Sequence, residues 1–103
     1  MQLRMGQTLV SPVDTATLVV VRAPAGDVEI TIGGVPVWDP KAGGAAPGGA
    51  ADPAQQDGTL LGKRYADENL GLELLCAKPG SGTLAVDGVA LPLKDAKPLP
   101  ASD

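Results

Sequence analysis

The apolar residues of this chain lie in short runs of strand-forming residues, separated by segments rich in Pro and Gly. In the first half, residues 18–22 and 28–32 are dominated by Val, Leu and Ile, and the five residues between them, 23–27, contain Pro and Gly. Residues 72–77 and 83–86 repeat the arrangement in the second half. Two such runs joined by a short Pro/Gly turn are typical of a β-hairpin, so the pattern predicts one hairpin in each half.

The polarity of these runs predicts how they lie in a sheet. Residues 28–32 alternate between aliphatic and polar side chains, which is typical of a strand in a sheet with one face in water. Residues 18–21 are apolar at every position, which predicts a strand in the centre of a sheet or under a partner. Gly33-Gly34 and Asp87-Gly88 each mark a further turn before a short apolar strand. Because no stretch has the apolar period of a helix, we expect an all-β fold.

The two halves of the chain are similar in sequence. Residues 17–37 align with 71–91 without a gap, at a constant offset of 54. The alignment includes five identities, Leu18/Leu72, Ala23/Ala77, Gly26/Gly80, Gly34/Gly88 and Val35/Val89. A repeat of this kind predicts the same fold for both halves.

Between the repeats lies a segment of different composition. Residues 39–58 contain no Val, Leu, Ile, Met, Trp or Tyr and are mostly Ala, Gly and Pro. Such a segment buries too little apolar surface to offset the entropy of ordering, so we expect a flexible linker. The predicted organisation is a first unit over 1–38, the linker over 39–58, a second unit over 59–95 and an extended tail over 96–103.

Composition and charge narrow the classes of function. The chain has 103 residues, no Phe or His, one Trp, one Tyr and one Cys, and a net charge of −4. An acidic chain without clustered Lys and Arg argues against binding to nucleic acid or to anionic membranes. The single Cys excludes an internal disulfide, and no segment has the length of a signal peptide core or a membrane span, so we expect a cytoplasmic protein.

Residues 62–88 resemble the desulforedoxin family of small rubredoxin-like iron proteins. Tyr65, Gly71, the run Gly82-Thr83-Leu84 and Gly88 stand where that family has the same residues. The four cysteine ligand positions of the family are occupied here by Asp67, Leu70, Val86 and Asp87, and Cys76 falls on a strand that supplies no ligand.

The resemblance therefore implies a rubredoxin-like β fold whose iron site has been lost, and we expect no cofactor. Apolar side chains at Leu70 and Val86 suggest that hydrophobic packing fills the former knuckles. A weaker possibility is a hard cation held by Asp67, Glu68 and Asp87. Because desulforedoxin is a dimer, the tandem repeat resembles such a dimer fused into one chain. We expect two hairpin units that form a pseudo-dimer around a shared small core.

The remaining candidate residues favour binding over catalysis. Cys76 lies between apolar neighbours and is expected to be a buried small hydrophobe rather than a reactive thiol. Tyr65 is either an anchor in a solvated turn or part of a polar cluster, and Trp38 is either an exposed anchor or a cap on the core. Val19 and Val21 belong to the run that is apolar on both faces.

We therefore expect a metal-free interaction or accessory subunit that binds a partner enzyme through an apolar β surface including Val19, Val21, Trp38 and Tyr65. The first alternative is a small biosynthetic enzyme, a cyclase or isomerase, with a pocket for a small molecule between the two units. The second alternative is a metal or redox protein that uses carboxylates or Cys76.

Overall fold

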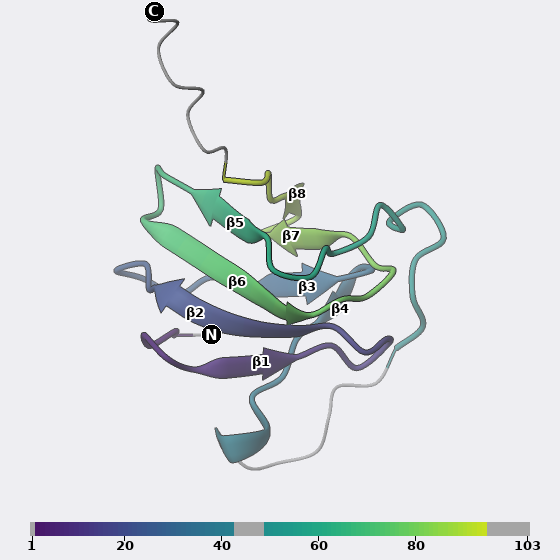
Figure 1. The fold of residues 1–103 in the computed structure, drawn as a ribbon, viewed down its shortest axis with the longest axis horizontal. Coiled ribbons are helices and arrows are strands. Elements are labelled where there is room, and N and C mark those ends of the chain that lie inside the picture. The colour runs from purple at the N-terminus through teal and green to yellow at the C-terminus, as the bar shows by residue number, and fades with distance from the viewer. Residues whose placement is uncertain (1, 43–48, 95–103) are drawn as a thin grey trace, which may run out of the picture.

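A computed structural model describes residues 2–42 and 49–94 as two packed β-sheets, each antiparallel and four-stranded (Figure 1). Sheet 1 has the strand order β1-β2-β6-β5 and sheet 2 the order β4-β3-β7-β8. The strands are β1 (Thr8–Val10), β2 (Thr17–Arg22), β3 (Ile30–Ile32), β4 (Val35–Pro36), β5 (Arg64–Asp67), β6 (Leu72–Lys78), β7 (Leu84–Val86) and β8 (Val89–Ala90). The prediction of an all-β chain is confirmed. The described residues form one short 3-10 turn, η1 (Pro40–Ala42), and no helix long and apolar enough to span a membrane.

The predicted hairpins are wrong, although their strands exist. β2 and β3 were expected to pair across residues 23–27, but β2 lies in sheet 1 and β3 in sheet 2. The same holds for β6 and β7. The hairpins that form are β1–β2, β3–β4, β5–β6 and β7–β8. The Pro/Gly segments are corners between the sheets, and local sequence does not distinguish a corner from a hairpin loop.

Strands from the two halves pair with each other at the centre of both sheets. β2 pairs with β6 in sheet 1, and β3 pairs with β7 in sheet 2. Val20 lies opposite Leu74, and Thr31 lies opposite Ala85. The members of these two pairs are 54 residues apart, so one residue in each central strand pair faces its own counterpart in the repeat.

One hydrophobic core lies between the sheets and is built from both halves. Five pairs of aliphatic residues at matching repeat positions are buried in it, Leu18/Leu72, Val20/Leu74, Ile30/Leu84, Ile32/Val86 and Val37/Leu91. β3 and β7 are buried at every position, Thr31 included. The predicted wet face of residues 28–32 is therefore not found within β3; of these residues only Glu29, which precedes the strand, is exposed.

The second turn of each half forms at the predicted position. Gly33 and Gly34 have φ of 61° and 82°, and Asp87 and Gly88 have φ of 49° and 84°. Two consecutive residues with positive φ make the two-residue hairpin turn that matches the twist of the strands. The expected short strands, β4 and β8, follow directly.

Part of the predicted linker contacts both halves. Asp52 donates its backbone N–H to the Gly33 carbonyl (2.7 Å), and the Gln55 carbonyl accepts a hydrogen bond from the Thr83 N–H (2.9 Å). The Asp57 N–H also donates to the Thr83 hydroxyl, at 2.9 Å. Residues 43–48 of the linker and the tail 96–103 lie outside the described residues, so the flexibility of these segments stays a prediction.

Candidate functional site

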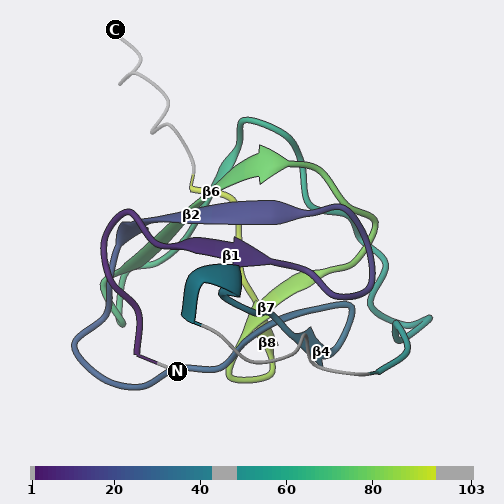
Figure 2. The same ribbon diagram turned by 90° about the horizontal axis from the view of Figure 1, so that it is seen from below.

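The fold leaves the outer face of sheet 1, with its half-buried apolar side chains, without a covering sheet. Sheet 2 packs against the other face of sheet 1, as the view from below shows (Figure 2). Along β2, Leu18 and Val20 are buried while Thr17, Val19 and Val21 are half-buried. Because side chains alternate along a strand, the first pair points into the core and the second set points outward.

Cross-strand neighbours define this outer face as three rows. The middle row runs through Thr8, Val19, Leu75 and Arg64. A row on one side contains Trp38, Val10, Thr17 and Lys78. The row on the other side contains Arg22, Glu73 and Ala66. The outer face therefore combines aliphatic residues and Trp38 with four charged residues, Arg22, Arg64, Glu73 and Lys78.

Three of the four residues predicted to bind a partner gather on this face. Val19 lies in its middle row, Val21 lies at the β-bulge where β2 shifts register against β6, and Trp38 pairs with Val10. Tyr65 does not join them. Its side chain belongs to the core, and its hydroxyl accepts a hydrogen bond from the Leu60 N–H at 2.9 Å.

Trp38 is half-buried, so it is neither the fully exposed anchor nor the buried core cap that the sequence left as alternatives. Its neighbour Val37 points into the core, so Trp38 itself is directed away from the core. The indole N–H is buried and has no hydrogen-bond partner among the described residues. An unpaired buried donor costs about 1–3 kcal/mol, so the position of this ring is set by its apolar contacts rather than by its polar atom.

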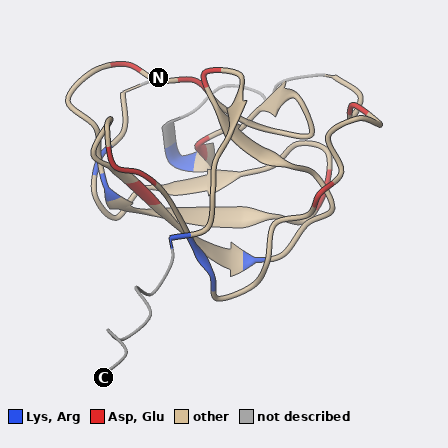
Figure 3. Ribbon diagram, turned by 90° about the horizontal axis from the view of Figure 1, so that it is seen from above, with Lys and Arg blue, Asp and Glu red and all other residues tan. Residues whose placement is uncertain are grey.

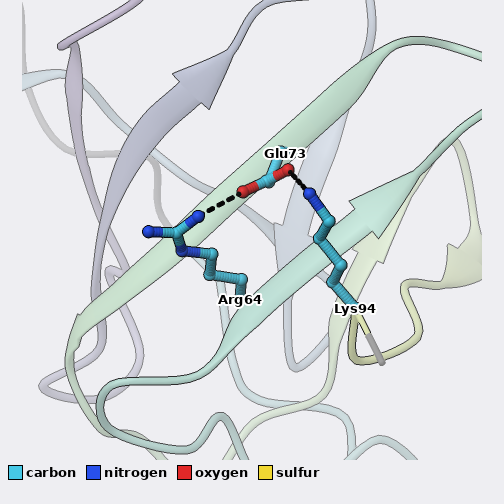
Figure 4. Close-up of polar contacts among 3 residues, drawn as sticks. All are labelled: Arg64, Glu73 and Lys94. Carbon is cyan, nitrogen blue, oxygen red and sulfur yellow. Dashed lines mark hydrogen bonds and ion pairs between the residues drawn. The ribbon is translucent and has the colours of Figure 1, made fainter. Parts of the chain in front are cut away.

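Glu73 is the buried charge of the outer face (Figure 4). Its side chain is 2% exposed, and its two carboxylate oxygens accept hydrogen bonds from Arg64 (3.2 Å) and Lys94 (2.7 Å). The hydrogen bond from Lys94, with the positive charges of Lys94 and Arg64, lowers the pKa of Glu73, although burial acts in the opposite sense. This cluster joins β6 to β5 and to the segment that follows β8.

The sequence pattern alone did not predict this cluster. The feature that could have indicated it is the acidic residue inside the apolar run 72–76. Its partners become visible only through strand pairing, because β5 lies beside β6 and the Lys94 N–H donates to the Arg64 carbonyl at 2.7 Å.

The four ligand positions that the resemblance implies lie apart: Asp67 makes local turn contacts, Asp87 contacts the first half of the chain, Val86 lies in the core and Leu70 lies in a turn. Asp67 Oδ1 accepts hydrogen bonds from the N–H groups of Asn69 (3.0 Å) and Leu70 (3.2 Å). Asp87 Oδ1 accepts one from the Glu29 N–H at 2.8 Å. Val86 is buried as expected, but Leu70 is 36% exposed, so the expectation that it fills a lost knuckle is wrong. A turn residue between β5 and β6 lies too far out to reach the core.

The carboxylates Asp67, Glu68 and Asp87 do not form a metal site within residues 2–42 and 49–94. No group of three or more His, Cys, Asp or Glu in these residues is arranged to hold a metal ion.

Cys76 is a buried core residue, as predicted. It is 1% exposed, and its thiol donates a hydrogen bond to the Lys78 carbonyl at 3.0 Å. Burial raises the pKa of the thiol, the contact with the Lys78 backbone acts in the opposite sense, and the negative charge of Asp14 adds to the rise. The net rise in pKa disfavours the thiolate, which is the reactive form.

Two clefts in the described part of the chain are each lined by one half. The cleft of the second half has a volume of about 210 Å³ and contains Leu60, Tyr65, Ala90 and Leu93. The cleft of the first half, about 280 Å³, is lined by polar residues such as Arg4, Gln7, Asp39 and Lys41. A pocket between the halves, as the enzyme alternative expected, is not among these two.

Comparison of the chain with known protein families, with curated proteins and with solved structures found no match. A function for the chain therefore has to be inferred from its own geometry and chemistry.

Proposed function

We propose that the chain is a metal-free binding subunit that docks a protein partner on the outer face of sheet 1. The observation that carries this proposal is the set of half-buried apolar side chains on that face, Val10, Val19, Val21, Leu75 and Trp38. Uncovered sheet faces with contiguous apolar side chains are typical of protein interaction sites.

Docking on the face is favoured over addition of a strand at the edge of sheet 1. The edge strand β1 exchanges hydrogen bonds with Trp38, at 2.7 and 3.0 Å. The opposite edge strand β5 is bonded to the segment after β8, through Ala66 N–H to the Pro92 carbonyl (3.1 Å). Both edges already have partners, so a partner chain gains few backbone hydrogen bonds there.

We further propose that the halves form a pseudo-dimer similar to a fused desulforedoxin dimer without its iron sites. The central strand pairs support this, because Val20 faces Leu74 and Thr31 faces Ala85 at matching repeat positions. Pairing of this kind is what a twofold axis between two equal units would produce. The rubredoxin-like character of each unit depends on the sequence resemblance.

The enzyme alternative has one observation in its favour, the cleft of about 210 Å³ that contains Tyr65. This volume is below the usual range for small-molecule sites, about 300–1,000 Å³. The metal or redox alternative uses carboxylates or Cys76; no group of carboxylates in the described residues is arranged to hold a metal ion, and burial raises the pKa of the Cys76 thiol. The binding role is therefore the better supported proposal.

A matched pair of valine substitutions tests the docking face. Val19→Asp places a charge in the middle row of the outer face, and Val89→Asp makes the same change on β8 of sheet 2, where Val89 is 67% exposed. We expect the complex isolated from the source cells to lose its stoichiometric partner with Val19→Asp and to keep it with Val89→Asp, both variants remaining folded by circular dichroism. Equal retention by both variants contradicts the proposal.

A further inference from the structure

Positive charge is concentrated on the outer face of sheet 1, although the chain is acidic. Arg22, Arg64, Lys78 and Lys94 are exposed there, and Glu73 is the one carboxylate among them. Four cations against one carboxylate leave the face with a charge of +3, whereas the whole chain has −4. Most of the described acidic residues lie in loops and turns away from this face (Figure 3).

The four cations differ in whether they already form an ion pair within the chain. Arg64 and Lys94 share the carboxylate of Glu73, while Arg22 and Lys78 form no ion pair with any described residue. Arg22 lies in the row that contains Glu73, and Lys78 lies in the row that contains Thr17. The middle row, with Val19 and Leu75, lies between these two rows. The face thus has an apolar centre flanked by two unpaired positive charges.

This charge distribution selects among possible occupants. A second copy of the chain docked face to face would bring +3 against +3, which like-charge repulsion disfavours. Nucleic acid would match the cations, but the aliphatic centre offers Trp38 as its one aromatic surface for base stacking. A protein segment with acidic residues around apolar ones matches both the cations and the valines.

On the basis of the proposed function, we propose that the outer face of sheet 1 binds an acidic, amphipathic protein segment whose apolar side chains cover Val19 and Leu75. The carboxylates of this segment pair with Arg22 and Lys78. Glu73 holds Arg64 and Lys94 in place and limits the positive charge beside the apolar centre.

Synthetic peptides test the sign of the charge. The probes are an extended peptide of about ten residues in which Glu alternates with Val, and its counterpart with Lys in place of Glu. Binding is followed by the fluorescence of Trp38, the single Trp of the chain, and by amide shifts in NMR spectra. We expect the Glu peptide to bind about tenfold more tightly than the Lys peptide, with shifts confined to sheet 1 and weaker binding when salt rises from about 0.05 to about 0.5 M.

Charge-reversed variants locate the contacts. Arg22→Glu combined with Lys78→Glu is expected to weaken binding of the Glu peptide about tenfold. Arg4→Glu combined with Lys41→Glu makes the same change in net charge at the cleft beside η1 and is expected to leave binding within about twofold.

Several outcomes overturn the inference. They are equal or tighter binding of the Lys peptide, tighter binding of a short single-stranded DNA, self-association through the face, and no binding of either peptide. None of them decides the proposed function, because that depends on the separate comparison of Val19→Asp with Val89→Asp in the native complex.

Discussion

Substitution of Gly80 by Ala tests how tightly the two halves interlock. Gly80 lies in the connection from β6 to β7, against the connection from β1 to β2. A Cβ atom at Gly80 would meet the Ala16 Cβ at 2.7 Å and would also meet the carboxylate of Asp14. Real Cβ atoms do not approach this closely, so one of the two connections must move.

Neither connection can move without losing hydrogen bonds. The Asp14 carboxylate accepts hydrogen bonds from the N–H groups of Ala16 (2.9 Å) and Gly82 (2.9 Å). Gly80 exchanges two backbone hydrogen bonds with Thr59, at 2.9 and 3.1 Å. Overpacking costs about 1–3 kcal/mol and each lost hydrogen bond about 1 kcal/mol, so we expect Gly80→Ala to lower the free energy of unfolding by about 2–4 kcal/mol.

The repeat supplies the control for this experiment. Gly26 occupies the matching position of the first half, and a Cβ atom there would meet nothing within 4 Å. Gly26→Ala is expected to change the free energy of unfolding by less than about 1 kcal/mol, with stabilisation favoured because Ala restricts the unfolded chain. Urea unfolding measures both values, and the Tm of Gly80→Ala should fall by more than about 8 °C. If the free energies of unfolding of the two variants differ by less than about 0.5 kcal/mol, the two connections do not pack as tightly as Gly80 indicates.

Three further predictions follow from the core and from Glu73. A fragment of residues 59–103 should not unfold cooperatively, because β6 and β7 lose their central partners from the first half; a sharp thermal transition of the fragment contradicts this. Glu73→Gln should lower the free energy of unfolding at pH 7 by about 1–2 kcal/mol, because it removes the charge that Arg64 and Lys94 contact while both cations stay partly in water. Since the pKa of Glu73 is lower in the folded state than its usual 4.5, its contribution is present above about pH 4.5 and is lost as pH falls towards the folded-state value, so wild type and variant should converge in acid melts. Cys76→Ser should cost about 1–2 kcal/mol in urea unfolding and leave partner binding intact; a folded Cys76→Ser protein without function would favour the redox alternative.

Part of the fold could be predicted from the sequence, although β1, β5 and the burial of Thr31 were not. Aliphatic runs predicted β2, β3, β6 and β7, and Asp87-Gly88, like its counterpart in the first half, predicted a two-residue turn. These features are local, since they depend on side-chain alternation and on the φ angles that Gly and Asp tolerate. The repeat added the expectation that both halves contribute to one core, and the buried pairs at offset 54 agree with it.

Which strands are neighbours depends on long-range packing. The alternation of side chains shows which side of a strand is buried, but it does not show which strand pairs with it. The turn between β2 and β3 became a corner between sheets, since pairing β2 with β6 and β3 with β7 buries both halves around one core. That pairing placed Arg22 opposite Glu73, residues far apart in sequence. The apolar and basic character of the outer face of sheet 1 arises from this long-range register, which no local pattern in the chain encodes.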